Sequence, residues 1–255
     1  MLRDLEGKTA LVTGASRGIG RGIAERLAAA GALVAVNYAS NDAAAQETLD
    51  AISGAGGEAF TIKAKLGDTP ESEALVLALD SELTRRKGSN GLDILINNIG
   101  VGDYRGLSDT TDELLDYIFT NNVFAPFKLT RALYDRISDN GRVINISSMA
   151  TRLIDKDTIA YNMSKAALEM FTVTLAKDLG RRGITVNSVA PGFTETDVNS
   201  AILEDPEQVK QVAANTLLGR FAGTDDIADF VHALVSPAGR WVAGQNIEAS
   251  GGFNF

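Results

Sequence analysis

Two polar side chains four positions apart, Tyr161 and Lys165, are the strongest candidates for acid–base chemistry. They open an apolar run that continues to Ala176, whose spacing predicts a helix buried on one broad face. Residues four apart are neighbours on a helix, so the phenol and the ammonium should share one side. A free phenol titrates near pH ~10, and a cation beside it favours phenolate and lowers its pKa. The pair is therefore a candidate general acid or base.

Two further polar positions support this interpretation. A partly buried tyrosine beside a solvated lysine would otherwise explain the pair equally well. Ser148, however, follows a predicted buried strand at residues 142–146, which should bring its hydroxyl to the mouth of the same site. Asn121 and Asn122 interrupt another apolar helical pattern, and an amide on a buried face needs a partner such as a carbonyl or a bound water.

A glycine-rich turn follows the first predicted strand, at residues 9–13. Gly14, Gly18 and Gly20 lie in this turn, and a helical pattern begins immediately after it. A strand, a glycine turn and a helix place backbone amides and a helix N-terminus against an anion such as a pyrophosphate. The spacing differs from the G-x-G-x-x-G fingerprint, and a purely structural turn is the alternative.

The second predicted strand, at residues 33–36, bears on cofactor choice. Its end carries no carboxylate before Asp42, although an NAD site usually has one there to bind the ribose hydroxyls. Arg17 in the glycine turn supplies a guanidinium instead, which suits a phosphate dianion. NADP(H) is therefore predicted over NAD(H). The alternative is that Arg17 and Arg21 are solvated helix charges.

The remaining pattern alternates between strands and helices. This alternation predicts one α/β domain over residues 1–255, with a doubly wound, seven-stranded, mostly parallel sheet and helices on both faces. Ligands of such sheets bind beyond the carboxyl ends of the strands, where Gly14, Asn97, Ser148 and Pro191 should converge. Further strands are predicted at 59–64, 92–97, 184–189 and 245–248, and helices at 43–52, 71–86, 112–137 and 225–235.

An irregular segment at residues 191–221 follows the sixth predicted strand. Asp205 and Pro206 divide it into two short predicted helices. An insertion at the ligand end of a sheet is a candidate lid.

Composition excludes several classes of protein. A net charge of −9 over 255 residues argues against a nucleic-acid surface, which needs a basic face. The chain has no cysteine and one histidine, so no metal site is predicted. Residues 1–8 lack the apolar core of a signal peptide, and no run of about 18 apolar residues indicates a membrane span. A cytoplasmic protein that does not associate with membranes is expected.

Taken together, these motifs resemble the short-chain dehydrogenase/reductase family over essentially the whole length of the chain. The ordered set is specific, whereas each motif alone is weak. Segments 37–39 and 191–197 are most similar to those of the 3-oxoacyl carrier-protein reductases. The resemblance implies a Rossmann fold for the whole chain. The resemblance rests on the turn at 13–20, the segment 97–100, Ser148, Tyr161 with Lys165, and Pro191 with Gly192.

The resemblance implies a role for each polar residue. Tyr161 would protonate a carbonyl oxygen while the nicotinamide delivers hydride to carbon, and Ser148 would hydrogen-bond the same oxygen. Lys165 would hold the ribose hydroxyls and lower the pKa of Tyr161. Asn122, rather than Asn121, would hold a water in the proton relay.

The same resemblance implies the cofactor contacts and the partners. The substrate would be a small carbonyl compound, either free or carried on acyl carrier protein or CoA. The protein would form homotetramers or homodimers through the Asn122 and Tyr161 helices and the C-terminal strand. The implied cofactor-binding residues are Gly14, Ser16, Arg17, Gly18, Ile19, Gly20, Tyr38, Ala39, Ser40, Asn98, Ile99, Gly100, Tyr161, Lys165, Pro191, Gly192, Thr194 and Thr196.

Five positions bear on how far the resemblance extends. Lys65 occupies the place of an aspartate that commonly contacts adenine, and Ile99 replaces the alanine of an NNAG segment. Thr194 stands where isoleucine or valine is usual. Arg182 fits the basic surface of a carrier-protein reductase, but Asp139 has the wrong sign for an acidic carrier.

Four functions remain open on the sequence alone. The leading hypothesis is an NADPH-dependent carbonyl reductase of a 3-oxoacyl thioester. A dehydrogenase of a sugar, steroid or small alcohol would use the same residues, and only segments 152–159 and 193–221 would separate the two. An enoyl reductase is disfavoured because its tyrosine would precede Lys165 by seven, at Thr158. A non-catalytic nucleotide sensor is disfavoured because all four catalytic positions are intact.

Overall fold

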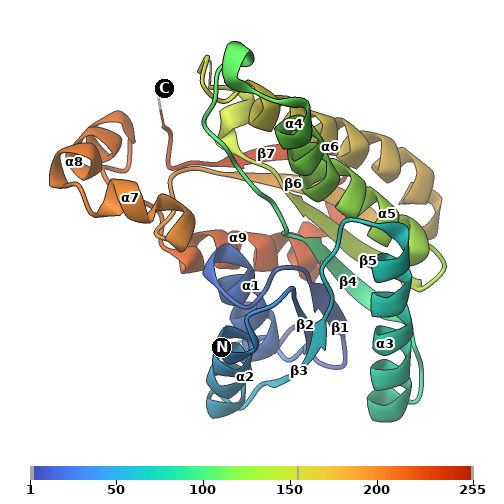
Figure 1. The fold of residues 1–255 in the computed structure, drawn as a ribbon. Coiled ribbons are helices and arrows are strands. Elements are labelled where there is room, and N and C mark those ends of the chain that lie inside the picture. The colour runs from blue at the N-terminus through green and yellow to red at the C-terminus, as the bar shows by residue number, and fades with distance from the viewer. Residues whose placement is uncertain (1–2, 154, 254–255) are drawn as a thin grey trace.

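The computed structural model describes residues 3–153 and 155–253. Met1, Leu2, Ile154, Asn254 and Phe255 lie outside the described part, and Ile154 belongs to segment 152–159. A seven-stranded sheet with the order β3-β2-β1-β4-β5-β6-β7 runs through the centre, and all of its pairings are parallel (Figure 1). This confirms the predicted fold class. The strands are β1 (Thr9–Val12), β2 (Leu33–Tyr38), β3 (Glu58–Lys63), β4 (Leu92–Asn97), β5 (Ile137–Ile146), β6 (Thr185–Pro191) and β7 (Asn246–Ala249).

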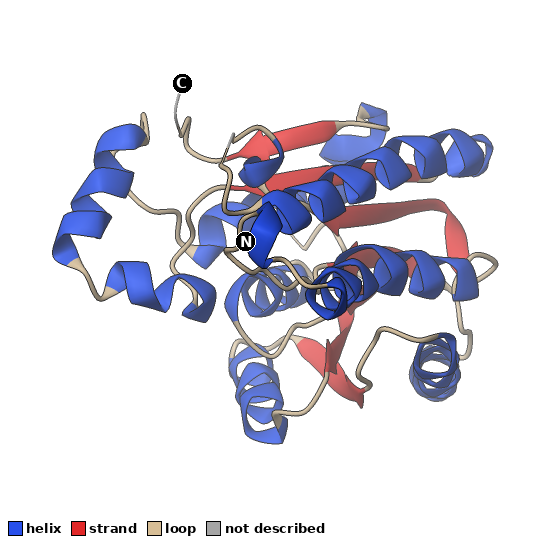
Figure 2. Ribbon diagram, turned by 45° about the horizontal axis from the view of Figure 1, so that its top comes forward, coloured by secondary structure: helices blue, strands red, loops and turns tan. Residues whose placement is uncertain are grey.

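Helices cover both faces of the sheet (Figure 2). Alternate side chains of each strand point to opposite faces, so Val34 and Val36 pack on one side with α1, α2 and α9. Leu33 and Ala35 pack on the other side with α3, α5 and α6. The helices are α1 (Gly18–Ala29), α2 (Asp42–Gly54), α3 (Thr69–Lys87), α4 (Asp112–Phe119), α5 (Ala125–Ala132), α6 (Ile159–Leu179), α7 (Ser200–Leu203), α8 (Pro206–Asn215) and α9 (Thr224–Val235).

The sheet order places the ligand crevice. β1 has β2 on one side and β4 on the other, so the chain changes direction across the sheet between these strands. In open parallel sheets, ligands bind beyond the carboxyl ends of the strands at such a switch point. The loops after β1, β4, β5 and β6 all end at this edge, and they carry the predicted site residues.

The helix predicted at 112–137 is wrong in two respects. It is interrupted by a π-turn, η2 (Thr120–Phe124), and it ends at Ala132. Leu133 and Ile137 continue the apolar spacing, but they are buried in a turn and at the start of β5. Arg182 donates to the Tyr134 carbonyl at 2.9 Å and to the Ile137 carbonyl, which stabilises this turn in place of a helix.

The turn predicted at Asn140 and Gly141 lies inside β5. Asn140 has a φ of 63°, a left-handed conformation that asparagine tolerates better than most residues. The register with β4 shifts between Leu92 and Ile94, so the irregularity is a bulge within the strand. The sequence therefore placed the irregularity correctly, but it is a bulge within a strand and not a turn between two elements.

The segment predicted as a lid contains the two short helices expected, α7 and α8. Both lie beside the sheet rather than on it (Figure 1). Its far end is bound to the C-terminal segment, because the amides of Leu217 and Leu218 donate to the carbonyls of Gly252 and Gly251, each at 3.2 Å. Across residues 3–153 and 155–253, no helix has the length and apolar content needed to cross a membrane.

Two leucines on α3 offer a matched test of the packing. Leu79 is fully buried and Leu77 is 68% exposed. We expect Leu79→Ala to lower the free energy of unfolding by about 2–5 kcal/mol, because it leaves a cavity against the sheet. Leu77→Ala should change it by about 0.5 kcal/mol or less. Urea unfolding measures both, and similar losses in the two variants would contradict the packing described.

Candidate active site

The structure brings the four predicted catalytic residues together at the carboxyl edge of the sheet. Ser148 follows β5, Tyr161 and Lys165 lie on the first turns of α6, and Asn122 lies in the π-turn. The Lys165 Nζ atom is 5.8 Å from the centre of the Tyr161 ring. Gly100 joins them, because a Cβ atom there would come within 2.8 Å of Lys165 Nζ and 3.5 Å of Asn122 Oδ1.

Lys165 is a buried cation. Its side chain is 3% exposed, and Nζ donates to the Ile146 carbonyl at 2.9 Å. Burial lowers the pKa of Lys165 to about 8, because removal from water disfavours the charged form, while the negative charge of Glu169 acts in the opposite direction. The ammonium therefore predominates at neutral pH and is lost as the pH rises through about 8.

Tyr161 departs from the expected electrostatics. Burial raises its pKa, the Ser148 hydroxyl lowers it in part, and the Tyr104 phenol raises it further. The prediction that Lys165 lowers this pKa is wrong for the structure as it stands, because the ammonium is directed to the Ile146 carbonyl rather than to the phenol oxygen. Tyr161 consequently keeps its proton at neutral pH and can act as a proton donor.

Asn122 is held by the π-turn. Its side chain is fully buried; Oδ1 accepts from the Val101 amide at 2.8 Å, and Nδ2 donates to the Val101 carbonyl at 2.8 Å and to Ser164 Oγ at 2.9 Å. Among the described residues, the Asn121 side chain donates only to the Tyr117 carbonyl, one turn earlier, at 2.8 Å. Both asparagines thus have the expected carbonyl partner, but that of Asn122 lies in the loop after β4, and a π-turn is a frequent feature of functional sites.

The glycine turn can accommodate an anionic group. Gly14 and Gly18 have φ values of 61° and 55°, which favour glycine, and a Cβ at Gly20 would lie 2.5 Å from the Gly14 carbonyl oxygen. Helix α1 begins at Gly18, and no side chain caps its first amides. Free amides at a helix N-terminus suit a pyrophosphate, so the turn fits a dinucleotide. Ser16, Arg17 and Ile19 complete this turn.

The end of β2 holds an ion cluster that the sequence analysis missed. Tyr38 donates to Asp42 Oδ1 at 2.7 Å, and Lys63 Nζ lies 2.9 Å from both oxygens of that carboxylate. The first carboxylate after the strand is therefore already occupied by its neighbours. Ala39 and Ser40 are exposed beside it. The part that Lys63 plays in this cluster follows only from the parallel pairing of β2 with β3, which places Lys63 opposite Tyr38.

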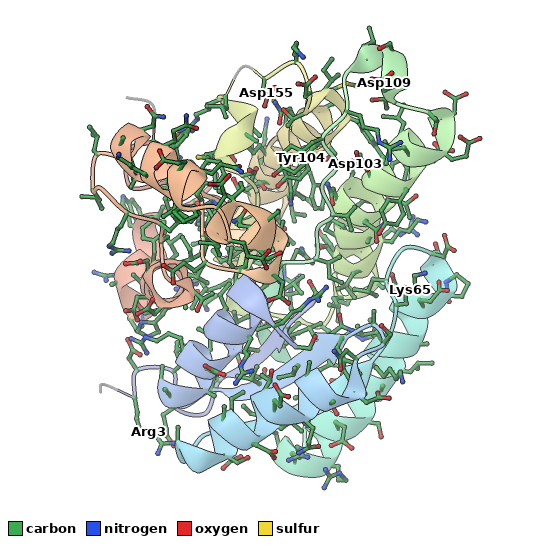
Figure 3. The ribbon with its side chains drawn as sticks, turned by 60° about the vertical axis from the view of Figure 1, so that its left-hand side comes forward. Arg3, Lys65, Asp103, Tyr104, Asp109 and Asp155 are labelled. Atoms are coloured by element: carbon green, nitrogen blue, oxygen red, sulfur yellow. The ribbon has the colours of Figure 1, made fainter. Side chains whose placement is uncertain are left out.

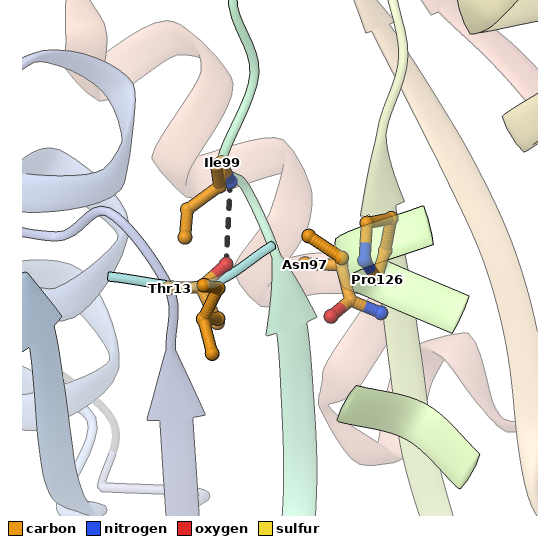
Figure 4. A pocket seen from close by; sticks show the side chains of 6 residues that line it. Thr13, Asn97, Ile99 and Pro126 are labelled. Carbon is orange, nitrogen blue, oxygen red and sulfur yellow. Dashed lines mark hydrogen bonds between the residues drawn. The ribbon is translucent and has the colours of Figure 1, made fainter. Parts of the chain in front are cut away.

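The segment after β4 is bonded to the glycine turn. Thr13 Oγ1 accepts from the amides of Asn98 and Ile99 at 2.9 and 3.2 Å, the second of which is drawn in Figure 4. The Asn98 side chain donates to the Thr13 carbonyl at 2.9 Å, so its amide supports the loop. A small cavity below is lined by Thr13, Leu66, Asn97, Ile99, Ala125 and Pro126. Asn97 Oδ1 is buried without a hydrogen-bond partner among the described residues.

The loop after β6 closes against the glycine turn. A Cβ at Gly192 would lie 2.7 Å from the Ser250 Cα atom, which explains the glycine after Pro191. Thr194 is buried, and its hydroxyl donates to the Gly192 carbonyl at 3.0 Å. The Thr196 methyl group would lie 3.4 Å from a Cβ at Gly18. Thr194, which departs from the family pattern, thus serves the loop itself.

Arg17 has a partner that the sequence did not reveal. Its guanidinium lies 3.3 Å from Asp197, at the start of the segment predicted as a lid, and both side chains are about 70% exposed. The two residues are 180 positions apart, which is why no local pattern indicated the pair. Lys65, at the position usually taken by aspartate, is exposed near the same edge (Figure 3).

Two loops form the outer rim of the site. Tyr104 and Asp103 belong to the loop after β4, and Asp155 to the loop before α6 (Figure 3). Tyr104 is 67% exposed, and it lies close enough to Tyr161 for its phenolate form to raise the pKa of Tyr161. The cations of these loops pair with carboxylates: Arg105 with Asp103 at 3.0 Å, Arg152 with Glu248 at 2.9 Å and Lys156 with Asp157 at 2.9 Å.

Comparison with known proteins gives consistent matches. A family model described as enoyl-(acyl carrier protein) reductase matches residues 14–254. The chain is similar to the promiscuous reductase LugOII, which catalyses keto-reduction at C1 during lugdunomycin biosynthesis, with 46% identity over 99% of this chain and 100% of that one and a TM-score of 0.95. It is similar to the angucycline C-6 ketoreductase LanV with bound NADP, with 45% identity, 98% and 97% coverage and a TM-score of 0.94. It is 39% identical to a hydroxynaphthalene reductase of Aspergillus fumigatus, over 94% of this chain and 90% of that protein.

The buried ammonium gives a direct titration test. We expect the Lys165 side chain to lose its proton near pH 8, because burial destabilises the cation. NMR of isotopically labelled lysine side chains follows this titration, and Lys165→Met identifies the signal by removing it. A Lys165 signal that titrates near the ordinary lysine value of ~10.4 would contradict the buried environment.

Proposed function

Because this chain is an oxidoreductase of the short-chain dehydrogenase/reductase family, we propose that it is an NADPH-dependent ketoreductase of polycyclic aromatic ketones. The observation that carries the proposal is the Tyr161 phenol, which is hydrogen-bonded to the Ser148 hydroxyl, has a pKa raised by burial, and has its ring centre 5.8 Å from the Lys165 Nζ atom. Ketone reduction needs a proton for the oxygen at the moment when hydride reaches the carbon. The site offers that proton at neutral pH.

Each side chain has a defined task in this mechanism. NADPH supplies the hydride when it is bound. Ser148 and Tyr161 donate hydrogen bonds to the ketone oxygen, which fixes the carbonyl and stabilises the negative charge that develops there. Tyr161 then transfers its proton to that oxygen, and the Ser148 hydroxyl stabilises the phenolate that remains, since its hydrogen bond lowers the pKa of Tyr161. Lys165 would hold the ribose hydroxyls of the cofactor. Asn122 holds the loop after β4 against α6 and would position the relay water.

Three observations support NADPH as the cofactor. The exposed Arg17 guanidinium stands at the glycine turn and can exchange Asp197 for a phosphate. Asp42, the carboxylate that could have received the ribose hydroxyls, is already bonded to Lys63 and Tyr38. The similar ketoreductase LanV was solved with bound NADP.

The rim and the segment 191–221 favour an aromatic substrate. The aromatic side chain of Tyr104 lies on the rim near Tyr161. Phe193 packs against Phe221 and Phe253, with ring centres 5.8 and 5.1 Å apart, so the base of this segment is aromatic. The hydroxynaphthalene reductase is named for a fused-ring aromatic compound, LanV for angucyclines, and LugOII for keto-reduction in lugdunomycin biosynthesis. We propose that 191–221 closes over such a substrate as a lid.

A 3-oxoacyl thioester is the second candidate, supported by the similarity of segments 37–39 and 191–197 to carrier-protein reductases. Arg182, however, is bonded to Asp139 at 2.9 Å and to two backbone carbonyls, so it is not free for an acidic carrier protein. The rim cations are also paired, which leaves little attraction for CoA phosphates. Enoyl reduction is not proposed, because Thr158 is buried and lacks a phenol.

We also propose one domain and a homo-oligomer. Helices α5 and α6 with the adjoining π-turn expose apolar side chains that a second copy would cover in a homodimer or homotetramer. They are Phe124, Phe127, Met163, Met170 and Val173, which are 40–65% exposed. A cytoplasmic location stays a prediction.

The substrate proposal is tested by initial rates of NADPH oxidation. The purified protein should reduce hydroxynaphthalene-type and angucycline-type ketones faster than acetoacetyl-CoA, with sugars and simple ketones as further comparisons. Tyr161→Phe should bind NADPH as the wild type does but lose turnover by about 10²–10⁴-fold, because the proton donor is absent.

Three outcomes would count against it. Faster reduction of the acetoacetyl thioester would favour the second candidate. Wild-type protein that binds NADPH but reduces none of these carbonyls would favour a non-catalytic nucleotide binder. Substantial turnover in Tyr161→Phe would remove the tyrosine from the mechanism.

Cofactor choice is tested by Arg17→Met, with Arg21→Met as the matched control because Arg21 pairs with Glu25 on its own helix. We expect KM for NADPH to rise about 10- to 100-fold in Arg17→Met, the equivalent of a lost hydrogen bond to a charged group, and KM for NADH to change little. Equal effects on both cofactors, or an equal effect of Arg21→Met, would contradict a phosphate-binding role.

A further inference from the structure

Glu169 connects the catalytic helix to the turn that carries Ser148. It lies one turn beyond Lys165 on α6, on the same side of the helix. Its Oε1 atom accepts a hydrogen bond from Ser147 Oγ at 2.8 Å and another from Thr151 Oγ1 at 3.0 Å, whose single proton is shared with the Ser148 carbonyl at 3.1 Å. These two donors flank Ser148 in the sequence on either side, so one carboxylate oxygen holds both ends of the serine turn.

The serine turn needs such an attachment. Ser148 follows β5 and Tyr161 lies on α6, and ten residues, 149–158, separate the serine from the start of that helix. Both groups must reach one carbonyl oxygen, which requires their positions to be fixed within about 0.5 Å. Side-chain bonds between α6 and this end of β5 involve Lys165, through the Ile146 carbonyl, and Thr172, through Asn145, whereas Glu169 reaches the hydroxyls on both sides of Ser148.

The charge of Glu169 also acts on the site. Among the described residues, no lysine, arginine or histidine nitrogen lies within 4.0 Å of its carboxylate, although the side chain is partly buried. Its negative charge is felt by Lys165 and favours the ammonium against the effect of burial. The other groups that face Lys165 are Tyr161 from α6, the neutral Asn122 amide from the π-turn, and the backbone of Ile146 and Gly100.

We propose that Glu169 is a positioning residue of the reaction, which clamps the Ser148 turn to α6 and supplies the counter-charge that faces Lys165. This inference rests on the proposed function, because it requires Ser148 and Tyr161 to act on one carbonyl. Glu169 itself does not contact the substrate. Its two tasks use different properties of the carboxylate, the hydrogen-bond acceptor and the charge, so they can be separated by substitution.

Three variants separate the two tasks, and Glu73→Gln on the exposed face of α3 is the matched control. Glu169→Ala removes the clamp and the charge, and kcat should fall about 10²-fold, as for a misplaced catalytic group. The double variant Ser147→Ala/Thr151→Val removes the two donors. Its kcat should fall by a similar factor, and its profile of kcat/KM for NADPH against pH should stay unchanged. Glu169→Gln keeps an acceptor oxygen and should regain most of kcat below neutral pH.

The pH profile tests the charge. In Glu169→Gln the pKa of Lys165 should fall further below about 8, because the opposing negative charge is gone. The ammonium is then lost at lower pH, so the alkaline fall of kcat/KM for NADPH should move to lower pH than in the wild type and in Glu73→Gln. A merely structural role for Glu169 would not move this limb.

Two results would overturn the proposal. One is a folded, NADPH-binding Glu169→Ala that keeps kcat within about twofold of the wild type, by the same misplacement argument. The other is an unchanged pH profile in Glu169→Gln. If the wild type reduces no ketone, the proposed function fails, and the clamp is then tested by hydrogen exchange at the amides of residues 147–151. Exchange should accelerate in Glu169→Ala but not in Glu73→Gln, and equal exchange would overturn the clamp.

Discussion

The burial of the Lys165 ammonium is the constraint on which the rest of the site depends. A cation removed from water must be compensated by nearby acceptors or charges. The Ile146 carbonyl at the end of β5 provides one acceptor, and Glu169 provides a negative charge one turn away. Gly100 must lack a side chain, because a Cβ atom would lie 2.8 Å from the ammonium nitrogen. A requirement set by one charge thus determines residues on three elements.

The parallel sheet makes this compensation possible. Strand carbonyls at the carboxyl edge have no backbone N–H of a neighbouring strand to donate to them. They can therefore accept hydrogen bonds from side chains of the helices that follow. The Ile146 carbonyl accepts a hydrogen bond from Lys165 in this way, and the Thr13 carbonyl, just after β1, accepts one from the Asn98 side chain after β4. The Tyr161 helix is therefore bonded to β5, and the loop after β4 to the glycine turn, through backbone groups that a doubly wound sheet leaves free at this edge.

The sequence predicted the elements and the main site well where the signal is local. Tyr161 and Lys165 are four apart on one helix, Ser148 follows an apolar strand, and the alternation of strands and helices predicted the sheet that the structure confirms. Prediction from the sequence failed where a residue's partner is distant in the chain, or where burial alone could not distinguish a helix from a turn. Arg17 meets Asp197 from 180 positions away, and the turn at Leu133 continues the apolar spacing of a helix that has already ended.

The direction of the Tyr161 pKa shift bears on the role of this group as a proton donor. Alcohol oxidation needs a phenolate to accept the proton, whereas ketone reduction needs the phenol to give one. Burial raises the pKa of Tyr161, and the Lys165 ammonium, with its pKa at about 8, is turned to the Ile146 carbonyl. At neutral pH both groups therefore carry their protons. The phenol is thus available as the proton donor that the proposed ketone reduction requires.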